Sequence, residues 1–328
     1  MRSPPSLRRV LAAPAALKGV LGAAEAAAAL AAGLREANVE ADELPIADGG
    51  DGTAEVLATV LGGQWRTARV SDALGRPIDA RWLCLLDGTA VVESAEAIGL
   101  RRLRPSERDP IRATSRGLGE LIRAAEATRP RALIVCLGGS ATVDGGAGVR
   151  EVIDSLSSQT TVLHDVRTTL PDAARLYGPQ KGATRDQVEV LARRLDGMAV
   201  LRPFASLPGA GAAGGLGAAL AALGGELVPG APFVLERIGF RERARRADLV
   251  VTGEGTVDAT TLEGKAPAEA LRICREERTR CAVFGGRVLL RELPGGELHK
   301  LVGGPDRAPE ALIALGHQLG DDVAHATG

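Results

Sequence analysis

The feature that most constrains the fold is the segment Leu133–Val149, which reads LIVCLGGSATVDGGAGV. Its first part, Leu133–Leu137, is a short apolar run with β-branched residues, and such runs are typical of buried strands. From Gly138 the composition changes to glycines, two hydroxyl side chains and one acid, Asp144. A strand that ends in glycines before an expected helix can present N–H groups and a helix dipole to an anion. A tight turn without a ligand has the same pattern, so this segment alone leaves both interpretations open.

Composition limits the class of protein further. The chain has 328 residues, of which 45% are hydrophobic and only 2% aromatic, so alanine, leucine and valine must build the core. Forty basic and 41 acidic residues give a net charge of −1, which argues against a nucleic-acid-binding protein. So few aromatic side chains also leave little for stacking on single-stranded bases. The length is enough for two domains.

The cysteines and the N-terminal segment favour a cytoplasmic protein. The chain has no C-x-x-C pair, and no cysteine lies near a histidine cluster, which argues against a structural zinc site. The N-terminal apolar run resembles a signal peptide, but Pro14 breaks it and Lys18 ends it. The alanine-rich run Ala23–Ala32 contains Glu25 and is too short to span a membrane. The four cysteines are Cys84, Cys136, Cys274 and Cys281.

Strands and helices are expected to alternate at both ends of the chain, which is typical of a parallel, doubly wound α/β sheet. Lys18 follows the first expected strand, while Asp48 and Asp51 follow the second. Ligands bind at the carboxyl ends of the strands in such sheets. The expected elements are strand 9–13, helix 21–36, strand 39–46, helix 54–60, helix 114–127, strand 133–137, strand 162–166, helix 186–196, strand 247–252, helix 268–277 and helix 309–319.

The order of these elements predicts two domains. From residue 64 to residue 97 the pattern changes to short strands separated by turn residues, which indicates a second domain. The α/β alternation returns after about residue 240, so the C-terminus is expected to complete the first domain. We therefore predict a discontinuous, Rossmann-like parallel-sheet domain from residues 1–63 plus 240–328. Residues 64–239 are expected to form an inserted α/β domain.

Two familiar nucleotide-binding motifs are not supported. The Gly264–Lys265 pair is followed by alanine and lacks the upstream glycine, so the chain has no Walker A motif. Residues 209–214 read GAGAAG and match G-x-G-x-x-G formally. Because Pro208 precedes this run and no clear strand leads into it, a tight turn into a helix explains it better. An NAD-linked enzyme therefore ranks well below the other hypotheses.

A different pattern recurs along the chain and is more informative. Four loops combine glycine with an acid or a lysine, and phosphoryl transfer needs such a mixture. Backbone N–H groups and lysines hold phosphate charge, while carboxylates hold Mg²⁺ and orient a hydroxyl group. Four such loops in one chain favour a phosphate-handling site over four independent turns. The loops are 47–53, 138–146, 178–182, and 253–255 with Asp258 and Lys265.

The longest of these motifs resemble a known family. The segments ADGGDGT, GGSATVDGGAG, YGPQKGAT, LPGAGAAGGLGAAL and ADLVVTGEGTVDATTLEGKAP occur in this order. Together they resemble the bacterial glycerate kinases of type I, and the resemblance covers nearly the whole chain. It implies ATP- and Mg²⁺-dependent phosphorylation of D-glycerate, most often giving 2-phosphoglycerate. It also implies an active site in the cleft between a Rossmann-like domain and an inserted domain. The partners are then the small-molecule substrate and ATP, and a homodimer is left open.

Matching positions imply roles for individual residues. Glu93 is a weaker candidate, for which a buried, paired acid is the alternative interpretation. Asp51 is equally compatible with a helix cap. The catalytic candidates are Lys18, Asp48, Asp165 and Lys181. The substrate- or phosphate-binding candidates are Gly49, Gly50, Gly138, Gly139, Ser140, Ala141, Thr142, Asp144, Gly145, Gly253, Gly255 and Lys265. The metal candidates are Asp51, Glu254 and Asp258.

The chain departs from the family pattern at several of these places. Ala15 stands where the family has an acid, Val143 where it has an asparagine, and Thr256 where it has an arginine. Arg167 replaces a second aspartate of the segment that follows His164. Each charged hydrogen bond contributes about 1.5–3 kcal/mol, so these losses should weaken binding. The alternative hypothesis is therefore a degenerate relative that binds a small acid or a nucleotide with little or no turnover.

Overall fold

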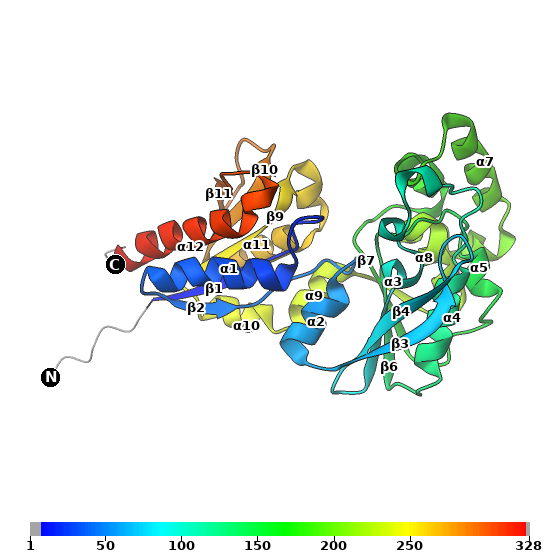
Figure 1. Ribbon diagram of the computed structural model, residues 1–328, viewed down its shortest axis with the longest axis horizontal. Coiled ribbons are helices and arrows are strands. Elements are labelled where there is room, and N and C mark those ends of the chain that lie inside the picture. Colours follow the sequence, from blue (N-terminus) through cyan, green and yellow to red (C-terminus); the bar gives the residue numbers. More distant parts are fainter. Residues whose placement is uncertain (1–7, 326–328) are drawn as a thin grey trace. The chain divides into compact units, whose positions relative to one another are not determined.

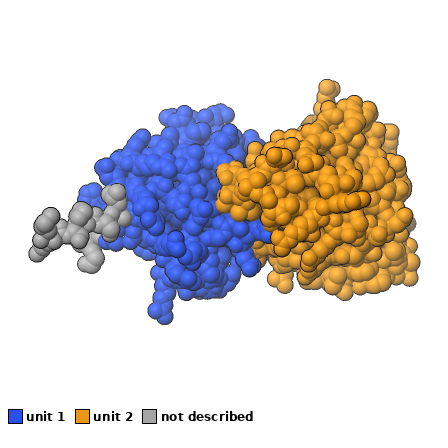
Figure 2. Space-filling model, turned by 90° about the horizontal axis from the view of Figure 1, so that it is seen from below, with its two compact units in different colours: residues 1–47, 234–328 blue, residues 48–233 orange. Residues whose placement is uncertain are grey.

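The computed structural model describes residues 8–325, which form two compact units (Figure 2). Unit 1 comprises residues 1–47 and 234–328, and unit 2 comprises residues 48–233. The expected boundaries at residues 63 and 240 therefore differ from the observed ones. The helix after the second strand belongs to unit 2, because its apolar side chains pack on the strands of that unit.

Unit 1 contains a five-stranded sheet in the order β11-β10-β9-β1-β2 (Figure 1). Every pairing in this sheet is parallel, as the alternation of strands and helices predicts. The strands are β1 (Arg9–Pro14), β2 (Glu40–Glu43), β9 (Leu249–Val257), β10 (Arg280–Val288) and β11 (Glu297–Lys300). The helices are α1 (Ala23–Glu36), α10 (Phe240–Arg245), α11 (Ala266–Glu277) and α12 (Ala308–His325), with 3₁₀ turns η6 (Ala259–Glu263) and η7 (Pro305–Arg307).

Helices α1 and α12 lie side by side over one face of this sheet (Figure 1). Their small residues allow a close approach, because a Cβ added at Gly33 would lie 1.9 Å from the carbonyl oxygen of Ile313. Leu30, Leu34 and Leu312 fill the space between the helices and the sheet and are fully buried. Alanine-rich, aromatic-poor composition thus produces a thin but closely packed core.

Unit 2 contains a six-stranded sheet in the order β3-β4-β5-β6-β7-β8. The β3-β4 and β4-β5 pairs are antiparallel, and the remaining pairs are parallel. The strands are β3 (Gln64–Ser71), β4 (Pro77–Cys84), β5 (Thr89–Glu93), β6 (Ala132–Leu137), β7 (Thr160–His164) and β8 (Glu226–Pro229). The mixed α/β class that the sequence predicts is therefore confirmed.

The α-helices of unit 2 are α2 (Thr53–Leu61), α3 (Ser94–Ile98), α4 (Arg116–Glu126), α5 (Ala147–Arg150), α6 (Ala173–Tyr177), α7 (Arg185–Asp196) and α8 (Ala212–Ala222), and α9 (Gly230–Arg237) crosses the boundary between the units. The 3₁₀ turns are η1 (Leu100–Arg102), η2 (Pro105–Glu107), η3 (Leu170–Asp172), η4 (Pro179–Lys181) and η5 (Ala199–Phe204).

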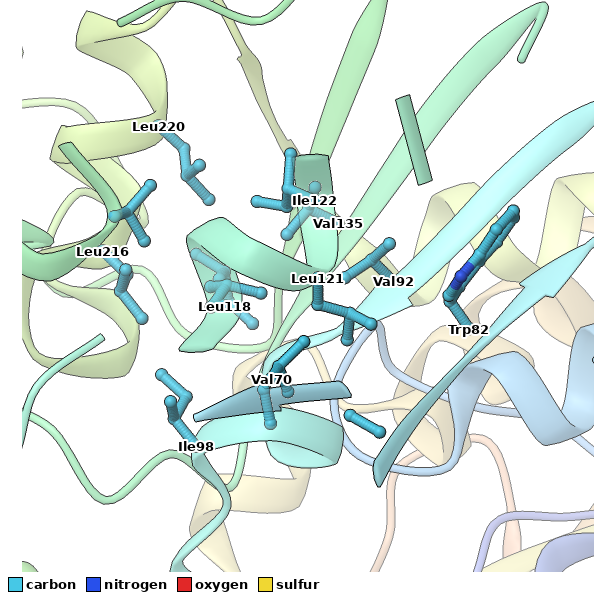
Figure 3. Close-up of a cluster of buried hydrophobic side chains, with 14 of the residues drawn as sticks. Val70, Trp82, Val92, Ile98, Leu118, Leu121, Ile122, Val135, Leu216 and Leu220 are labelled. Carbon is cyan, nitrogen blue, oxygen red and sulfur yellow. The ribbon is translucent and has the colours of Figure 1, made fainter. Parts of the chain in front are cut away.

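The main core of unit 2 lies between the sheet and helices α4 and α8 (Figure 3). Leu118, Leu121 and Ile122 of α4 recur at helical spacing and are fully buried. Figure 3 shows their side chains in one buried cluster with Val92 and Val135, which come from β5 and β6. This packing holds the parallel strands, so their carboxyl ends are fixed supports for the loops that follow.

The helix expected after each of two glycine-rich segments, 138–148 and 209–214, is short in the first and regular in the second. Strand β6 is followed by α5, which has only four residues and therefore carries little of the dipole that we expect after Gly138. The GAGAAG segment is a tight turn that leads into a helix, as predicted. There Ala213 (φ 52°), Gly214 and Gly215 have positive φ, and the regular helix follows them.

The N-terminal segment that resembles a signal peptide lies partly outside the described residues, which begin at residue 8. Its apolar run forms β1, and Val10–Ala13 are buried in the sheet of unit 1. Across residues 8–325, no helix combines the length and the hydropathy that crossing a bilayer requires.

Candidate active site

The acidic loop 48–52 leads into α2 and lies against the carboxyl end of β6. A Cβ added at Gly138 would lie 2.7 Å from the Cα atom of Gly50 and 3.0 Å from the backbone nitrogen of Asp51. The backbones of the two loops are therefore in contact, and no larger side chain fits at position 138. Two glycine-rich motifs that are 88 residues apart in the sequence meet at one edge of the sheet.

Two predicted catalytic acids of unit 2 converge at this edge. A Cβ added at Gly50 would lie 3.2 Å from Oδ1 of Asp48 and 3.8 Å from Oδ2 of Asp165. Asp48 also accepts a hydrogen bond from the backbone nitrogen of Gly50 at 3.1 Å. Asp165 directly follows β7, next to β6 in the sheet. The parallel pairing of β6 and β7, together with the contact of Gly138 with Gly50, thus places Asp165 beside the loop that carries Asp48.

Glu93 supports the acidic loop 48–52 through a hydrogen bond to the first turn of α2. It is the last residue of β5 and is 5% exposed, and its Oε1 atom accepts a hydrogen bond from the backbone nitrogen of Ala54 at 2.7 Å. Burial raises the pKa of Glu93 to about 7, against the lowering effect of the Ala54 hydrogen bond, and the charge of Asp51 raises it further. The carboxyl group caps α2, so the alternative of a buried structural acid describes this residue better than a substrate ligand does.

We expect Glu93→Gln to change how the free energy of unfolding depends on pH. The folded carboxyl group keeps its proton up to about pH 7, whereas the unfolded group loses it near 4.5, so wild-type stability falls as pH rises between these values. The glutamine variant should lack this fall, which amounts to at most about 3 kcal/mol. Urea unfolding at pH 4.5, 6 and 8 measures it.

The matched control for this experiment is Glu55→Gln, which changes an exposed glutamate in the first turn of the same helix. This control should keep the wild-type pH dependence. Equal pH dependence in wild type and Glu93→Gln would contradict the assignment of the titration to Glu93.

Arg101 contacts the same loop and belongs to a cluster of three arginines around Glu96. Arg101 of η1 places its Nε atom 3.4 Å from Oδ2 of Asp51, and its Nη2 atom 3.1 Å from Oε1 of Glu96. Glu96 is buried and also pairs with Arg81 and Arg102. Burial acts to raise the pKa of Glu96, but hydrogen bonds and charge from the arginines hold it below its usual value. Sequence reasoning missed this cluster, for which the E-x-x-x-x-R-R spacing from Glu96 was the available signal.

The glycine loop after β6 is tied down on one side and open on the other. The backbone nitrogen of Ala141 donates to Ile98 at 2.8 Å, and that of Leu100 donates to Gly139 at 2.7 Å. Within residues 8–325, the backbone nitrogens of Gly139 and Ser140 donate no hydrogen bond to another protein group. Gly139 is exposed, so its N–H group is the part of the predicted cradle that a ligand can reach.

The side chain of Lys181 is 4% exposed and contacts the glycine loop that follows β6. Its ammonium group donates to Ser140 Oγ at 3.0 Å and to the carbonyl oxygen of Thr142 at 2.7 Å. Burial lowers the pKa of Lys181 to about 7, and the charge of Asp144 opposes this shift. The expectation that Lys181 itself neutralises phosphate is not supported by this geometry. Its contacts make it a positioning residue for the loop.

Asp144 has a structural role as well. Its carboxylate accepts hydrogen bonds from the backbone nitrogen and the hydroxyl group of Ser115, both at 2.8 Å. It also accepts from the backbone nitrogens of Gly146 and Gly148, at 3.1 and 3.2 Å. A carboxylate with four donors is satisfied and has little capacity left for a ligand. Five predicted binding residues are therefore buried in the support of the loop: Ser140, Ala141, Thr142, Asp144 and Gly145.

The predicted residues of unit 1 lie at the carboxyl end of its own sheet. The backbone nitrogen of Ala15, directly after β1, donates to Gly253 of β9 at 2.9 Å. A Cβ added at Gly255 would lie 3.7 Å from the backbone nitrogen of Lys18, so the exposed Lys18 turn is a neighbour of β9. Lys265 caps α11 and places its Nζ atom 3.5 Å from Oε2 of Glu254. Unit 1 thus carries a second group of candidates at one edge.

The predicted metal ligands already have partners. Asp51 pairs with Arg101, and Glu254 accepts a hydrogen bond from Thr261 Oγ1 at 2.7 Å. Asp258 caps η6, where hydrogen bonds from Thr260 lower its pKa. Among the described residues, three or more His, Cys, Asp or Glu side chains do not gather as a metal site would require. Because Mg²⁺ commonly uses only one or two protein carboxylates together with waters and phosphate oxygens, the metal role of Asp51, Glu254 and Asp258 stays a prediction.

Two departures from the family pattern have less effect than the sequence suggests. Val143 is fully buried among the apolar residues of α7 and α8, so its isopropyl group does not enter the cradle. Thr256 of β9 pairs in register with Arg287 of β10, which is exposed. A guanidinium group therefore remains on this part of the sheet. Arg167 is exposed two residues after Asp165, so that replacement does change the charge of the site.

Comparisons with known proteins identify the family of this chain. The sequence model of the glycerate kinase family matches residues 10–155 and 149–297. Glycerate 2-kinase of Escherichia coli (strain K12) is 34% identical over 82% of both chains, and glycerate kinase of Bacillus subtilis (strain 168) is 36% identical over 79% of this chain and 80% of the relative. The crystal structure of a protein named "putative glycerate kinase 2" from Salmonella typhimurium LT2 superposes with a TM-score of 0.81 at 30% identity, and covers 97% of this chain and 98% of that one. This chain belongs to the glycerate kinase family and is a phosphotransferase of the kinase class.

Proposed function

We propose that this protein transfers the γ-phosphoryl group of ATP to the 2-hydroxyl group of D-glycerate and releases 2-phosphoglycerate. The observation that carries the proposal is the convergence of Asp48 and Asp165 on Gly50, beside the glycine loop of β6. Phosphoryl transfer needs a carboxylate that orients the attacking hydroxyl group and N–H groups that hold the charge of the transferred group. The names of the relatives supply the substrate class.

The residues of unit 2 would divide the work in the following way. Asp165 accepts the hydrogen bond of the acceptor hydroxyl group and takes its proton as the new P–O bond forms. Gly139 donates its N–H group to an oxygen of the transferred phosphoryl group. Asp48, with Asp165, would hold Mg²⁺, which supplies charge neutralisation on the phosphate oxygens. For Lys18 and Lys265 of unit 1, a phosphate-binding role stays a prediction from the family resemblance.

A direct assay tests the proposal. We expect release of ADP that depends on both Mg-ATP and D-glycerate, and ³¹P NMR of the product should show a phosphate ester coupled to the single C2 proton. Absence of glycerate-dependent ADP release would refute the kinase function. A signal coupled to the two C3 protons would keep the kinase and refute the 2-position.

A degenerate relative that binds without turnover is the second candidate, because Arg167 places a cation two residues after the proposed base and Ala15 replaces an acid at the end of β1. Calorimetry distinguishes the two candidates. Heat of binding for D-glycerate or ATP, in a protein preparation that releases no ADP, would favour the second one.

A further inference from the structure

Arg101 lies beside the glycine loop of unit 2, and no role follows for it from the sequence motifs. It belongs to η1, whose first residue, Leu100, donates its backbone N–H group to the carbonyl oxygen of Gly139. The Arg101 side chain is 52% exposed, whereas Glu96, which holds it, is 7% exposed. A buried acid therefore fixes one side of a guanidinium group whose other side reaches solvent.

The contacts with Asp51 and Glu96 occupy only part of this guanidinium group. Its Nε atom faces Asp51 at 3.4 Å and its Nη2 atom faces Glu96 at 3.1 Å. Within residues 8–325, Nη1 donates no hydrogen bond to another protein group. An arginine has five N–H donors in a planar fork, so the Nη1 side of Arg101 keeps donors for one more anion.

The open side of the Arg101 guanidinium group suits a carboxylate. A carboxylate carries one negative charge and accepts two parallel N–H donors, whereas a triphosphate carries several negative charges.

We propose that Arg101 binds the carboxylate group of the acceptor substrate and thereby selects a sugar acid over a neutral polyol. The inference rests on the proposed function, since it names the group that holds the acceptor of that reaction. Asp51, which contacts Nε of Arg101, follows Asp48 by three residues in the loop that lies against Gly138. The carboxylate contact and the proposed carboxylates for hydroxyl orientation are thus parts of one loop assembly in unit 2.

The test compares D-glycerate with D-glyceramide, which has the same shape but no charge. The wild-type protein should prefer D-glycerate in kcat/KM by at least about tenfold. In Arg101→Gln we expect KM for D-glycerate to rise roughly 10- to 100-fold, as the loss of a charge-assisted contact implies. KM for ATP should stay within about twofold, and the preference for D-glycerate over D-glyceramide should largely disappear. Arg101→Lys should recover part of the preference.

Arg81→Gln is the matched control. Arg81 is 50% exposed and contacts the same Oε1 atom of Glu96 at 3.3 Å, but it does not contact Asp51. This variant loses the same buried partner, so the two variants should have similar melting temperatures, while Arg81→Gln keeps the wild-type KM. Because the acceptor ratio is measured within one protein preparation, a general loss of folded enzyme does not change it.

Several outcomes would overturn the assignment. Equal KM values for D-glycerate in Arg101→Gln and Arg81→Gln would contradict it. An unchanged preference for D-glycerate over D-glyceramide, or a parallel rise in KM for ATP, would contradict it as well. In each case an active wild type would leave the proposed function standing. If the wild type releases no ADP, calorimetric affinity for D-glycerate replaces KM: weaker binding in Arg101→Gln supports the role, and equal binding overturns it. A wild type that neither binds nor phosphorylates D-glycerate refutes both proposals.

Discussion

Asp165→Asn is expected to lower kcat for D-glycerate phosphorylation by roughly 10²- to 10⁴-fold, the range typical of a lost general base. The amide keeps the shape of the side chain and can still orient a hydroxyl group, but it does not take the proton. KM for D-glycerate should change much less than kcat, because the contact with the hydroxyl group strengthens mainly in the transition state. Steady-state ADP release at saturating substrates measures the effect.

The control for this variant is Asp154→Asn, an exposed acid of the same unit that lies in the loop after α5. It should have the wild-type kcat. Both proteins should show cooperative unfolding at similar temperatures, which excludes misfolding as the cause. A kcat for Asp165→Asn within tenfold of wild type would assign the base elsewhere, and Asp48 would be the next candidate because it lies beside the same glycine.

Lys181→Met should have the second largest effect, on both stability and activity. The methionine removes the donor to the buried Thr142 carbonyl oxygen and to Ser140 Oγ, and an unsatisfied buried acceptor costs about 1–3 kcal/mol. It also removes the desolvation cost of a buried ammonium group, so the net loss of stability at pH 7 is expected to lie at the low end of that range. Activity should fall at least about tenfold, because the loop with Gly139 loses its support.

The pH dependence of the free energy of unfolding tests Lys181 more specifically than the net loss of stability does. The folded Lys181 loses its proton near pH 7, whereas the unfolded side chain keeps it up to about 10.5. The unfolded chain then binds more protons, so this group makes the free energy of unfolding rise with pH from 7 to 10.5. Lys181→Met should lack that rise. Lys300→Met, at an exposed position of β11, should keep it. The same rise in both variants would show that Lys181 does not titrate in this range.

Much of the architecture follows from local pattern. The expected strand 133–137, the alanine-rich helix 21–36 and the strand 247–252 occur close to their expected places, because periodicity and apolar runs report burial directly. The expected boundary at residue 63 differs from the limit of the compact units at residue 47 for a physical reason. Whether α2 belongs to one unit or the other depends on which sheet its apolar face meets, and its own sequence does not contain that information.

The candidate site, like the fold, was predictable from the sequence only in part. Sequence motifs identified the loops with Asp48, Gly138 and Asp165, because glycine and acids at strand ends are local signals. They did not separate residues that can face a ligand from residues that support the loop. Lys181 and Asp144 carry the charges that a phosphate site needs, yet both are consumed by backbone and hydroxyl partners. Arg101 has no motif, but its partners place it beside the glycine loop.

The sequence by itself thus determined the α/β class and the glycerate kinase family, and it predicted four loops as candidates for the chemistry. Only the tertiary structure decided the role of each polar side chain. A hydrogen bond or an ion pair forms between groups that are neighbours in space, and the partners of Lys181 and Glu93 lie about 40 residues away in the chain. Burial then sets the pKa values of these two groups near 7, and composition does not report burial.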